Sequence, residues 1–576
     1  MRQKLVDNVA GKLIIWALII TTVAVTPKTT SDPINPVKLA SLAIFSFGIA
    51  ALVFSSFNRL DLKKYKGPIL AVIAFLVILI INIVTSGRNF YQEFFGVYGR
   101  NTGFIAYVSL TLLLVSSVIV STRNLVEKYL VTLVLVGAVS MIYGYLQFMG
   151  LDPAGWNSPY SPIIGFLGNP NFASAFQAIS LVGVVFLIRN QQTTVIRKVT
   201  CFVYILLALF LMVLSGDQQG FLVLIIGIAV VVTIRVYLSR FRKIIVLILA
   251  SGAFGFTLLL LAIFNHGPLA KYVYESSLVS RGYYWRAALG MLQDNPVLGV
   301  GLDSFGDWYF RFRPIAAYDS LPFQNTNSAH NVYLDIATSG GLPLIIAYFA
   351  MNLFVVRSIL INLRASREFD LAFAVLVGCW VGYLAQMFVS INQIGLAIWG
   401  WTISGLIIGY QSHKENSETE IKIKSKRVNS QDRNQLEAKS ILAVFSGVLL
   451  GGVVGLPPLV ADTKYFTEMS TGDAIRIQKA ASIWPPRQQY YLQVSITLRE
   501  NKASTIAANP GLDPESIQDY SSLGLSVARE MVQKFPNSYY SWELLRSFSN
   551  LTPAEDEITK VKMKELNPIA YSSSKY

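Results

Sequence analysis

The histidine at position 330 is the side chain best placed to exchange a proton in this sequence. It lies in QNTNSAHNVYLDIATSGGLPLIIAYF, residues 324–349, where an Asn-rich polar run meets a long apolar segment. Of the three histidines, His413 lies in a charged linker and His266 lies earlier in the same connection as His330. An imidazole with a pKa near 6.5 can accept a proton at neutral pH. His330 is therefore a candidate general base, and a capping or hydrogen-bonded interfacial histidine is the alternative.

Two arginines precede this histidine in the stretch SRGYYWR, residues 280–286. A guanidinium group holds a phosphate through two parallel hydrogen bonds, so Arg281 or Arg286 could bind an anionic ligand. They are five residues apart on an expected helix and need not share a face. These arginines favour an anionic ligand near His330.

Other polar residues around His330 have two interpretations each. Asp335 could orient the imidazole and raise its basicity, or it could be a capping or solvated aspartate. Asn325, Asn327 and Asn331 suit either sugar hydroxyls or turns. Further along, Gly340-Gly341-Leu342-Pro343 predicts a break between the short helix next to the histidine and the following apolar helix.

The elements that position these side chains are transmembrane helices. The 576 residues have a mean hydropathy of +0.49, with 53% hydrophobic and only 14% charged residues, which indicates an all-α polytopic membrane protein. A span needs about 20 mostly apolar residues. Thirteen segments qualify: 12–26, 37–57, 68–86, 103–121, 129–150, 171–188, 199–215, 219–238, 244–264, 341–361, 371–390, 393–411 and 440–461.

Basic residues in every second connection predict the topology. Short loops rich in Lys and Arg stay cytoplasmic. With a cytoplasmic N-terminus, all the expected inner connections are basic, at residues 59–66, 123–128, 189–198, 235–243, 357–367 and 422–433. The net charge of +15 is thus a signal of topology and gives little support for nucleic-acid binding. The first span could instead be a cleaved signal peptide, which would leave the later topology unchanged.

This topology divides the chain into parts. Residues 1–411 form the membrane unit, and its long outer connection, 265–340, is too rich in Trp and Tyr for disorder, which predicts a helical extracytoplasmic cap. A cytoplasmic linker follows at 412–439, and 440–461 is the last transmembrane helix. Residues 462–576 form an extracytoplasmic helical domain that either resembles tetratricopeptide repeats or is a plain helical bundle.

Several motifs follow one another between residues 99 and 345. The main ones are Ser280-Arg281, Trp285, Asn295-Pro296, Gly299, Gly301, His330-Asn331 and Gly341. Lesser ones are Gly99-Arg100-Asn101-Thr102-Gly103, Tyr143-Gly144-Tyr145-Leu146-Gln147 and Gly168-Asn169-Pro170-Asn171. In order and spacing they resemble the O-antigen ligase/polymerase superfamily (Wzy_C type) of bacterial envelope glycosyltransferases.

The resemblance implies a GT-C-like enzyme of the plasma (inner) membrane that transfers a glycan from undecaprenyl diphosphate to an acceptor hydroxyl on the outer face. It implies that His330 is the base and that Arg281 holds the diphosphate. The chain departs from the family at Gln219, where a second arginine is expected. Arg100 could replace that arginine, and Gln219 could still donate a neutral hydrogen bond. We include Arg286, Asn331 and Asp335 among the candidate substrate-binding residues.

The residues of the outer loops also indicate which cofactors and partners to expect. The outer loops of the membrane unit have no Asp-x-Asp or Glu-x-Asp pair, so we expect a reaction without metal or cofactor. The expected partners are the lipid-linked glycan, an acceptor glycan, lipid or protein, membrane lipid and, through the C-terminal domain, other envelope proteins. The sequence does not separate a ligase from a polymerase. A lipid-linked oligosaccharide transporter, the alternative of another class, would be expected to carry intramembrane charges or inverted repeats.

Overall fold

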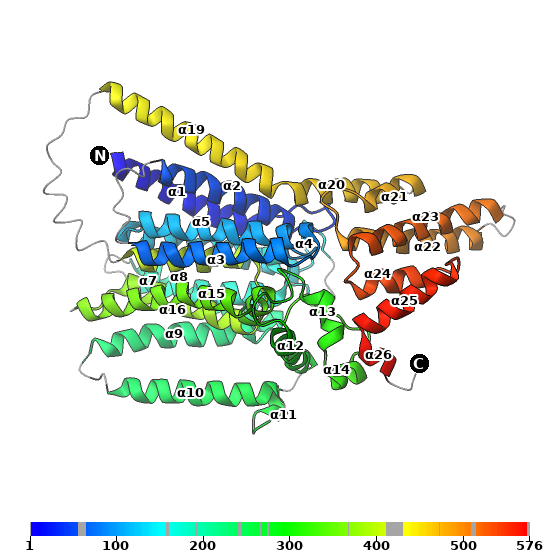
Figure 1. The fold of residues 1–576 in the computed structure, drawn as a ribbon. Coiled ribbons are helices and arrows are strands. Elements are labelled where there is room, and N and C mark those ends of the chain that lie inside the picture. The colour runs from blue at the N-terminus through cyan, green and yellow to red at the C-terminus, as the bar shows by residue number, and fades with distance from the viewer. Residues whose placement is uncertain are drawn as a thin grey trace.

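In the part of the chain that the structure describes, all the regular secondary structure is helical (Figure 1). The computed structural model describes residues 2–55, 65–156, 161–189, 194–239, 241, 243–264, 266–273, 276–366, 368–410, 430–471, 473–508 and 514–572. The cytoplasmic linker expected at 412–439 lies largely outside these residues, and only its last part is described. The all-helical fold class is confirmed.

Long helices lie side by side in a bundle. They are α1 (Arg2–Val23), α2 (Asn35–Phe54), α3 (Lys66–Thr85), α5 (Phe104–Val120), α6 (Arg123–Phe148), α7 (Pro170–Arg189), α8 (Val195–Ser215), α9 (Gln219–Tyr237), α10 (Ile244–Ile263), α15 (Val332–Ala365), α16 (Leu371–Phe388), α17 (Ile394–Gly409) and α19 (Ser430–Gly455). Each segment that the sequence predicts as a span lies mainly on one of these helices, and the last, 440–461, runs from α19 into α20 (Pro457–Met469).

Most of these helices are long and apolar enough to cross a membrane. Among the described residues, ten helices meet that test, while α5 and α17 are shorter. A further span is possible if α19 and α20 (Pro457–Met469) count as one, since together they pass the test but are bent by 45° around Leu456. These helices indicate a multi-pass membrane protein, and the number thirteen remains a prediction.

The remaining helices of the membrane unit are short, except for α12. They are α4 (Phe90–Phe95), η3 (Gly165–Leu167), α11 (Ala270–Val273), α12 (Ser276–Asp294), α13 (Phe305–Phe312) and α14 (Ile315–Ser320). The helices α11 to α14 occupy the connection between α10 and α15, where the sequence predicts a cap, and we call residues 266–331 the cap. Tyr284, Trp285, Met291, Phe305 and Phe310 form its apolar core.

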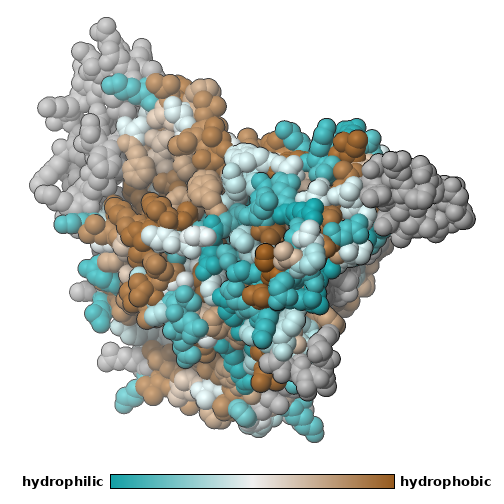
Figure 2. Space-filling model, turned by 45° about the vertical axis from the view of Figure 1, so that its right-hand side comes forward, coloured by the Kyte–Doolittle hydropathy of each residue, from teal (hydrophilic) through white to brown (hydrophobic). Residues whose placement is uncertain are grey.

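The C-terminal helices extend from the same end as the cap, while the N-terminus lies at the opposite end (Figure 1). They are α20, α21 (Ala474–Ala481), α22 (Gln488–Ala508), α23 (Pro514–Lys534), α24 (Tyr539–Arg546), α25 (Pro553–Leu566) and α26 (Pro568–Ser572). We call them the C-terminal domain, and they have an apolar core of their own. Figure 2 shows hydrophobic residues over the bundle and hydrophilic ones toward the cap and C-terminal domain. The tetratricopeptide-like arrangement is not confirmed.

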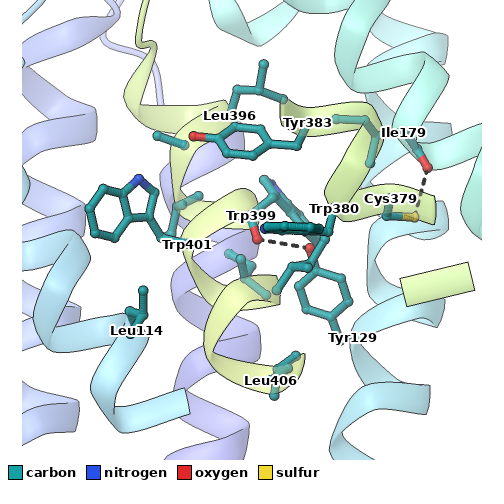
Figure 3. Packing of buried hydrophobic residues seen from close by; sticks show 14 of the residues in the cluster. Leu114, Tyr129, Ile179, Cys379, Trp380, Tyr383, Leu396, Trp399, Trp401 and Leu406 are labelled. Carbon is teal, nitrogen blue, oxygen red and sulfur yellow. Dashed lines mark hydrogen bonds between the residues drawn. The ribbon is translucent and has the colours of Figure 1, made fainter. Parts of the chain in front are cut away.

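Buried aromatic side chains and close helix contacts stabilise the bundle. The Trp399 indole is 1% exposed and donates a hydrogen bond of 2.8 Å to the Thr22 hydroxyl. The Tyr129 hydroxyl donates to the Trp399 carbonyl over 3.2 Å (Figure 3). A Cβ on Gly405 would overlap with the Leu114 carbonyl, so α17 and α5 approach closely. These contacts set the positions of α5 and α17 relative to the rest of the bundle.

Hydrogen bonds join the C-terminal domain to the bundle. The Asp462 carboxylate accepts from the Asp32 backbone N–H at 2.7 Å and from the Tyr490 hydroxyl at 2.9 Å. From the cap, the Arg313 guanidinium donates to the Asn567 side chain at 3.1 Å. The domain is therefore attached both to the loop before α2 and to the cap.

Candidate active site

The loop before α15 holds His330 in a constrained backbone conformation. The φ angle of His330 is 53°, in the left-handed region that non-glycine residues seldom adopt. Its backbone N–H donates to the Ser328 hydroxyl at 2.9 Å. That hydroxyl and the Ala329 backbone N–H donate to the two oxygens of Asp335, at 2.6 and 2.7 Å. Asp335, in the first turn of α15, thus holds the loop that carries the histidine.

Asn331 begins the helix that follows. Its side-chain oxygen accepts hydrogen bonds from the backbone N–H groups of Tyr333 and Leu334, at 3.0 and 3.1 Å. This is an N-cap, which satisfies donors that have no partner inside the helix. The side chain is 3% exposed. Turn or cap formation, one of the two interpretations of Asn331 from the sequence, describes what this side chain does in the structure.

A break in α15 joins the histidine loop to the cap. Gly340 and Gly341 have non-helical backbone angles, which confirms the break predicted from the sequence. The Val300 backbone N–H donates to the Thr338 carbonyl at 2.7 Å, and the Leu342 N–H to the Pro296 carbonyl at 2.7 Å. The loop after α12 therefore satisfies backbone groups that the broken helix leaves free.

The imidazole of His330 stacks on an aromatic ring and is close enough to two arginines to feel their charge. It stacks on Tyr284 of α12, with the ring centroids 5.5 Å apart and the planes 30° apart. Burial lowers the pKa of His330 to about 3, and the nearby charges of Arg100 and Arg281 add to the effect. The imidazole is therefore neutral at pH 7, which is the protonation state that a base requires.

Arg281 approaches the imidazole from α12. Burial lowers the pKa of Arg281, and the negative charge of Asp217 opposes this change. Asp217 lies between α8 and α9 and accepts from the Gly220 backbone N–H at 3.3 Å. Burial raises the pKa of Asp217, which Arg281 in turn opposes. The aspartate thus offsets part of the arginine charge.

Gln219 lies next to that aspartate, at the start of α9. It is 7% exposed, and neither its amide oxygen nor its amide nitrogen has a hydrogen-bond partner among the described residues. Buried polar groups nearly always have partners, so an amide with both ends free is suited to a bound ligand. Asp217 accepts a hydrogen bond from the Gln219 backbone and interacts electrostatically with Arg281, so it links the two residues.

Arg100 approaches His330 from the loop between α4 and α5. Burial lowers the pKa of Arg100, while the carboxylates of Asp335 and Asp303 oppose this change. Arg100 and these two aspartates line one small cavity, together with Ser328 of the histidine loop. Segments that lie more than two hundred residues apart in the sequence therefore meet at this cavity.

Asp303 fixes the loop that carries Arg100 and is a residue that the sequence did not single out. Its carboxylate accepts from the Val97 backbone N–H at 2.9 Å and from the Thr102 hydroxyl at 3.0 and 3.1 Å. Asp303 has a φ of 55°, as unusual as that of His330. The sequence indicated a role for Asp303 only by its position, two residues after Gly301 of the predicted motif.

Arg286 lies apart from this charge cluster. Its side chain is exposed, and its guanidinium lies 5.9 Å from the centre of the Phe264 ring, at the end of α10. The structure therefore brings together His330, Arg281 and Arg100 and places Arg286 toward α10. Tyr284, the stacking partner of His330, was also missed, because a tyrosine in a helix carries no signal of its neighbour across the fold.

Comparison with known proteins places most residues of this site within a region that matches a known family model. No curated protein matches the chain at a significant level. Residues 203–349, from within α8 through the cap to within α15, match the family model Wzy_C, described as O-antigen ligase. This region contains Arg281, Gln219 and His330 but not Arg100. The part of the chain that carries the histidine is thus similar to the O-antigen ligases.

Proposed function

We propose that the protein is a membrane glycosyltransferase of the O-antigen ligase type. Its donor is a glycan on a polyprenyl diphosphate such as undecaprenyl diphosphate, and its acceptor is a hydroxyl group. The observation that carries the proposal is the neutral imidazole of His330 beside the guanidinium groups of Arg100 and Arg281. The similarity of residues 203–349 to O-antigen ligases supports it.

Arg100 and Arg281 bind the diphosphate in this proposal. Both guanidinium groups lose hydration through burial, which lowers the pKa of each. An anionic ligand would offset that loss of hydration and accept charge-assisted hydrogen bonds from the planar groups. Gln219, whose amide has no partner among the described residues, would supply a neutral contact. The diphosphate would thus bind two buried guanidinium groups and one amide that has no partner among the described residues.

His330 acts as the general base. The acceptor oxygen attacks the anomeric carbon while its proton passes to the imidazole, and the bond from that carbon to the phosphate oxygen breaks. The diphosphate leaves with the electron pair of this bond, so the arginines stabilise the negative charge that develops on it. No metal is required in this reaction, because the arginines supply the positive charge.

The proposed location follows from the helices and the charge pattern. The bundle crosses the plasma membrane with the N-terminus in the cytoplasm, and the cap and C-terminal domain lie outside. His330 lies in the cap next to α15, and in this proposal that position is at the depth where a lipid anchor holds the diphosphate. The acceptor then approaches from the cap side.

The test is transfer from purified lipid-linked glycan by the full-length protein in lipid vesicles. His330→Ala should lower turnover by roughly 100- to 10,000-fold, the usual worth of a positioned general base, and leave donor binding nearly unchanged. His330→Asn is the sharper variant, because asparagine tolerates the left-handed backbone and hydrogen-bonds but cannot take the proton. It should be as inactive as His330→Ala. Full activity of either variant would exclude the base role.

Two further measurements define the reaction. Transfer should continue in excess chelator, and its abolition by chelator would exclude a metal-free reaction. The glycan sizes in a deletion strain distinguish the two enzyme types that use this donor. Full-length chains that remain unattached indicate a ligase, whereas loss of long chains with single units retained indicates a polymerase.

A further inference from the structure

A polar cavity of about 250 Å³ lies where the C-terminal domain meets the cap. The bundle side contributes the turn after α4, at residues 96–98, and the cap contributes residues around α13 and the stretch 325–327. The C-terminal domain contributes the start of α22 and residues 535–540. The cavity therefore exists only because the C-terminal domain is docked on the cap.

Amide side chains and aromatic rings form much of the lining. The amide residues include Asn325 and Asn327 of the cap and Gln488 and Gln489 of α22, and the rings include Tyr540. Amides both donate and accept hydrogen bonds, which is the pattern that sugar hydroxyls need. A ring with a polar tip adds an apolar surface on which the C–H face of a sugar can pack.

The charged groups that line the cavity are largely satisfied within the protein. The Asp307 carboxylate accepts from the Gln92 side chain at 3.1 Å, and Asp303 is engaged by the loop that carries Arg100. The Arg487 guanidinium donates to the Gly96 carbonyl. Two carboxylates against one guanidinium disfavour an anionic ligand, so an uncharged, hydroxyl-rich ligand fits best.

One group of the lining has a free donor. Arg487 is 4% exposed, yet its Nη2 atom has no hydrogen-bond partner among the described residues. A buried guanidinium nitrogen without a partner is unfavourable unless a ligand or water accepts from it. The lining thus holds a buried donor that protein groups leave unused.

The cavity adjoins the candidate active site. Asp303 and Asn327 line both this cavity and the smaller one that contains Arg100 and Asp335. Asn327 is exposed and lies three residues before His330 in the same loop. A chain molecule in the larger cavity would therefore end beside the smaller cavity of Arg100 and Asp335, in the loop that carries His330.

We propose that this cavity is a binding subsite for an uncharged oligosaccharide, formed jointly by the cap and the C-terminal domain. The inference rests on the proposed function in that the bound sugars belong to one of the two glycan substrates. The subsite holds sugar residues beyond the reacting one, so it positions the chain and selects for it without taking part in bond breaking. The C-terminal domain thus contributes directly to substrate recognition.

The binding test uses the full-length protein in detergent and one probe, the oligosaccharide released by mild acid from the lipid-linked glycan of the source membranes. Asn327→Ala and Gln489→Ala each remove one exposed amide from the lining, and each should weaken binding of this probe by roughly 5- to 10-fold, the worth of one or two hydrogen bonds. Gln533→Ala, an exposed glutamine of α23 outside the cavity, is the matched control and should bind like the wild type. Equal affinity in all four proteins, or no binding by the wild type, would overturn the proposal.

A kinetic arm identifies which substrate supplies the sugars. If they belong to the acceptor, both cavity variants raise the KM for acceptor and leave the KM for donor unchanged, and the reverse pattern assigns them to the donor. An unchanged KM for both substrates would overturn the proposal. The binding arm needs no turnover, so a protein that binds the oligosaccharide but transfers nothing would contradict the proposed function and leave the subsite standing.

Discussion

The low pKa of His330 makes the pH dependence of the proposed reaction a sharp test of the site. Burial and the charges of Arg100 and Arg281 lower this pKa from 6.5 to about 3 in the protein without donor. A base whose pKa is lowered stays neutral until the pH falls to that value. Between pH 5 and pH 8, His330 in the free enzyme is therefore fully deprotonated and ready to accept a proton.

The expected size of the effect follows from the two pKa values. The ratio kcat/KM reports the ionisation of the free enzyme. An imidazole with a pKa of 6.5 would be about 9% neutral at pH 5.5, so kcat/KM would fall about 10-fold from pH 7.5. With a pKa of about 3, as for His330, the same change in pH should lower kcat/KM less than about 2-fold.

The assay measures initial rates of transfer from lipid-linked glycan by reconstituted protein between pH 5 and pH 8. Intrinsic fluorescence at each pH confirms that the protein stays folded. The charge of Arg100 helps to lower the pKa of His330. Arg100→Gln removes this charge, so the fall of kcat/KM on the acid side should begin at a higher pH than in the wild type. Arg235→Gln, an exposed arginine that lies over Phe369, is the charge-matched control. A 10-fold fall in wild-type kcat/KM centred near pH 6.5 would refute the reasoning.

Three further predictions follow from named residues. Arg281→Lys should lower kcat/KM by roughly 10- to 100-fold, because lysine keeps the charge but loses the planar pair of donors; wild-type transfer by this variant would remove Arg281 from the site. Gly299→Ala should destabilise the protein by about 2–4 kcal/mol, since φ is 65° and a Cβ would overlap with the Thr338 carbonyl. Gly155→Ala, at a φ of 66° with open space around it, should cost only about 1–2 kcal/mol, and an equal fall in Tm for both would contradict the steric argument. A reporter fused after Lys464 should be active only outside the cytoplasm, and cytoplasmic activity would contradict the predicted topology.

The helices of the bundle were predictable because their signal is local. A run of about 20 apolar residues is visible in the sequence whatever the helix packs against, and each such run is mainly helical in the structure. The break at Gly340 and Gly341 was predictable for the same reason, since two glycines and a proline disfavour a continuous helix. The bend between α19 and α20 was missed, although Pro457 and Pro458 gave a comparable signal.

The interior of the site was less predictable because its contacts join distant segments. His330 and Arg281 could be singled out by residue type and by the order of motifs. The hydrogen bond from Thr102 to Asp303 and the stacking of Tyr284 on His330 depend on how the cap folds and packs on the bundle. Hydrophobic periodicity carries no information about such pairs. The cap connection could be recognised by its length, but its internal arrangement could not.

In the proposed reaction, the arrangement of charges couples donor binding to activation of His330 as the base. In the free protein the two arginines weaken His330 as a base, because an imidazolium beside them would be repelled. A bound diphosphate neutralises part of that charge, so it raises the pKa of His330 when the acceptor is to be deprotonated. The coupling is reciprocal, since a proton on His330 must strengthen the binding of the anion by the same factor. As the proton arrives on the imidazole, the departing diphosphate gains negative charge close by. The new positive charge and the new negative charge thus stabilise each other in the transition state, when both are forming, and much less before it.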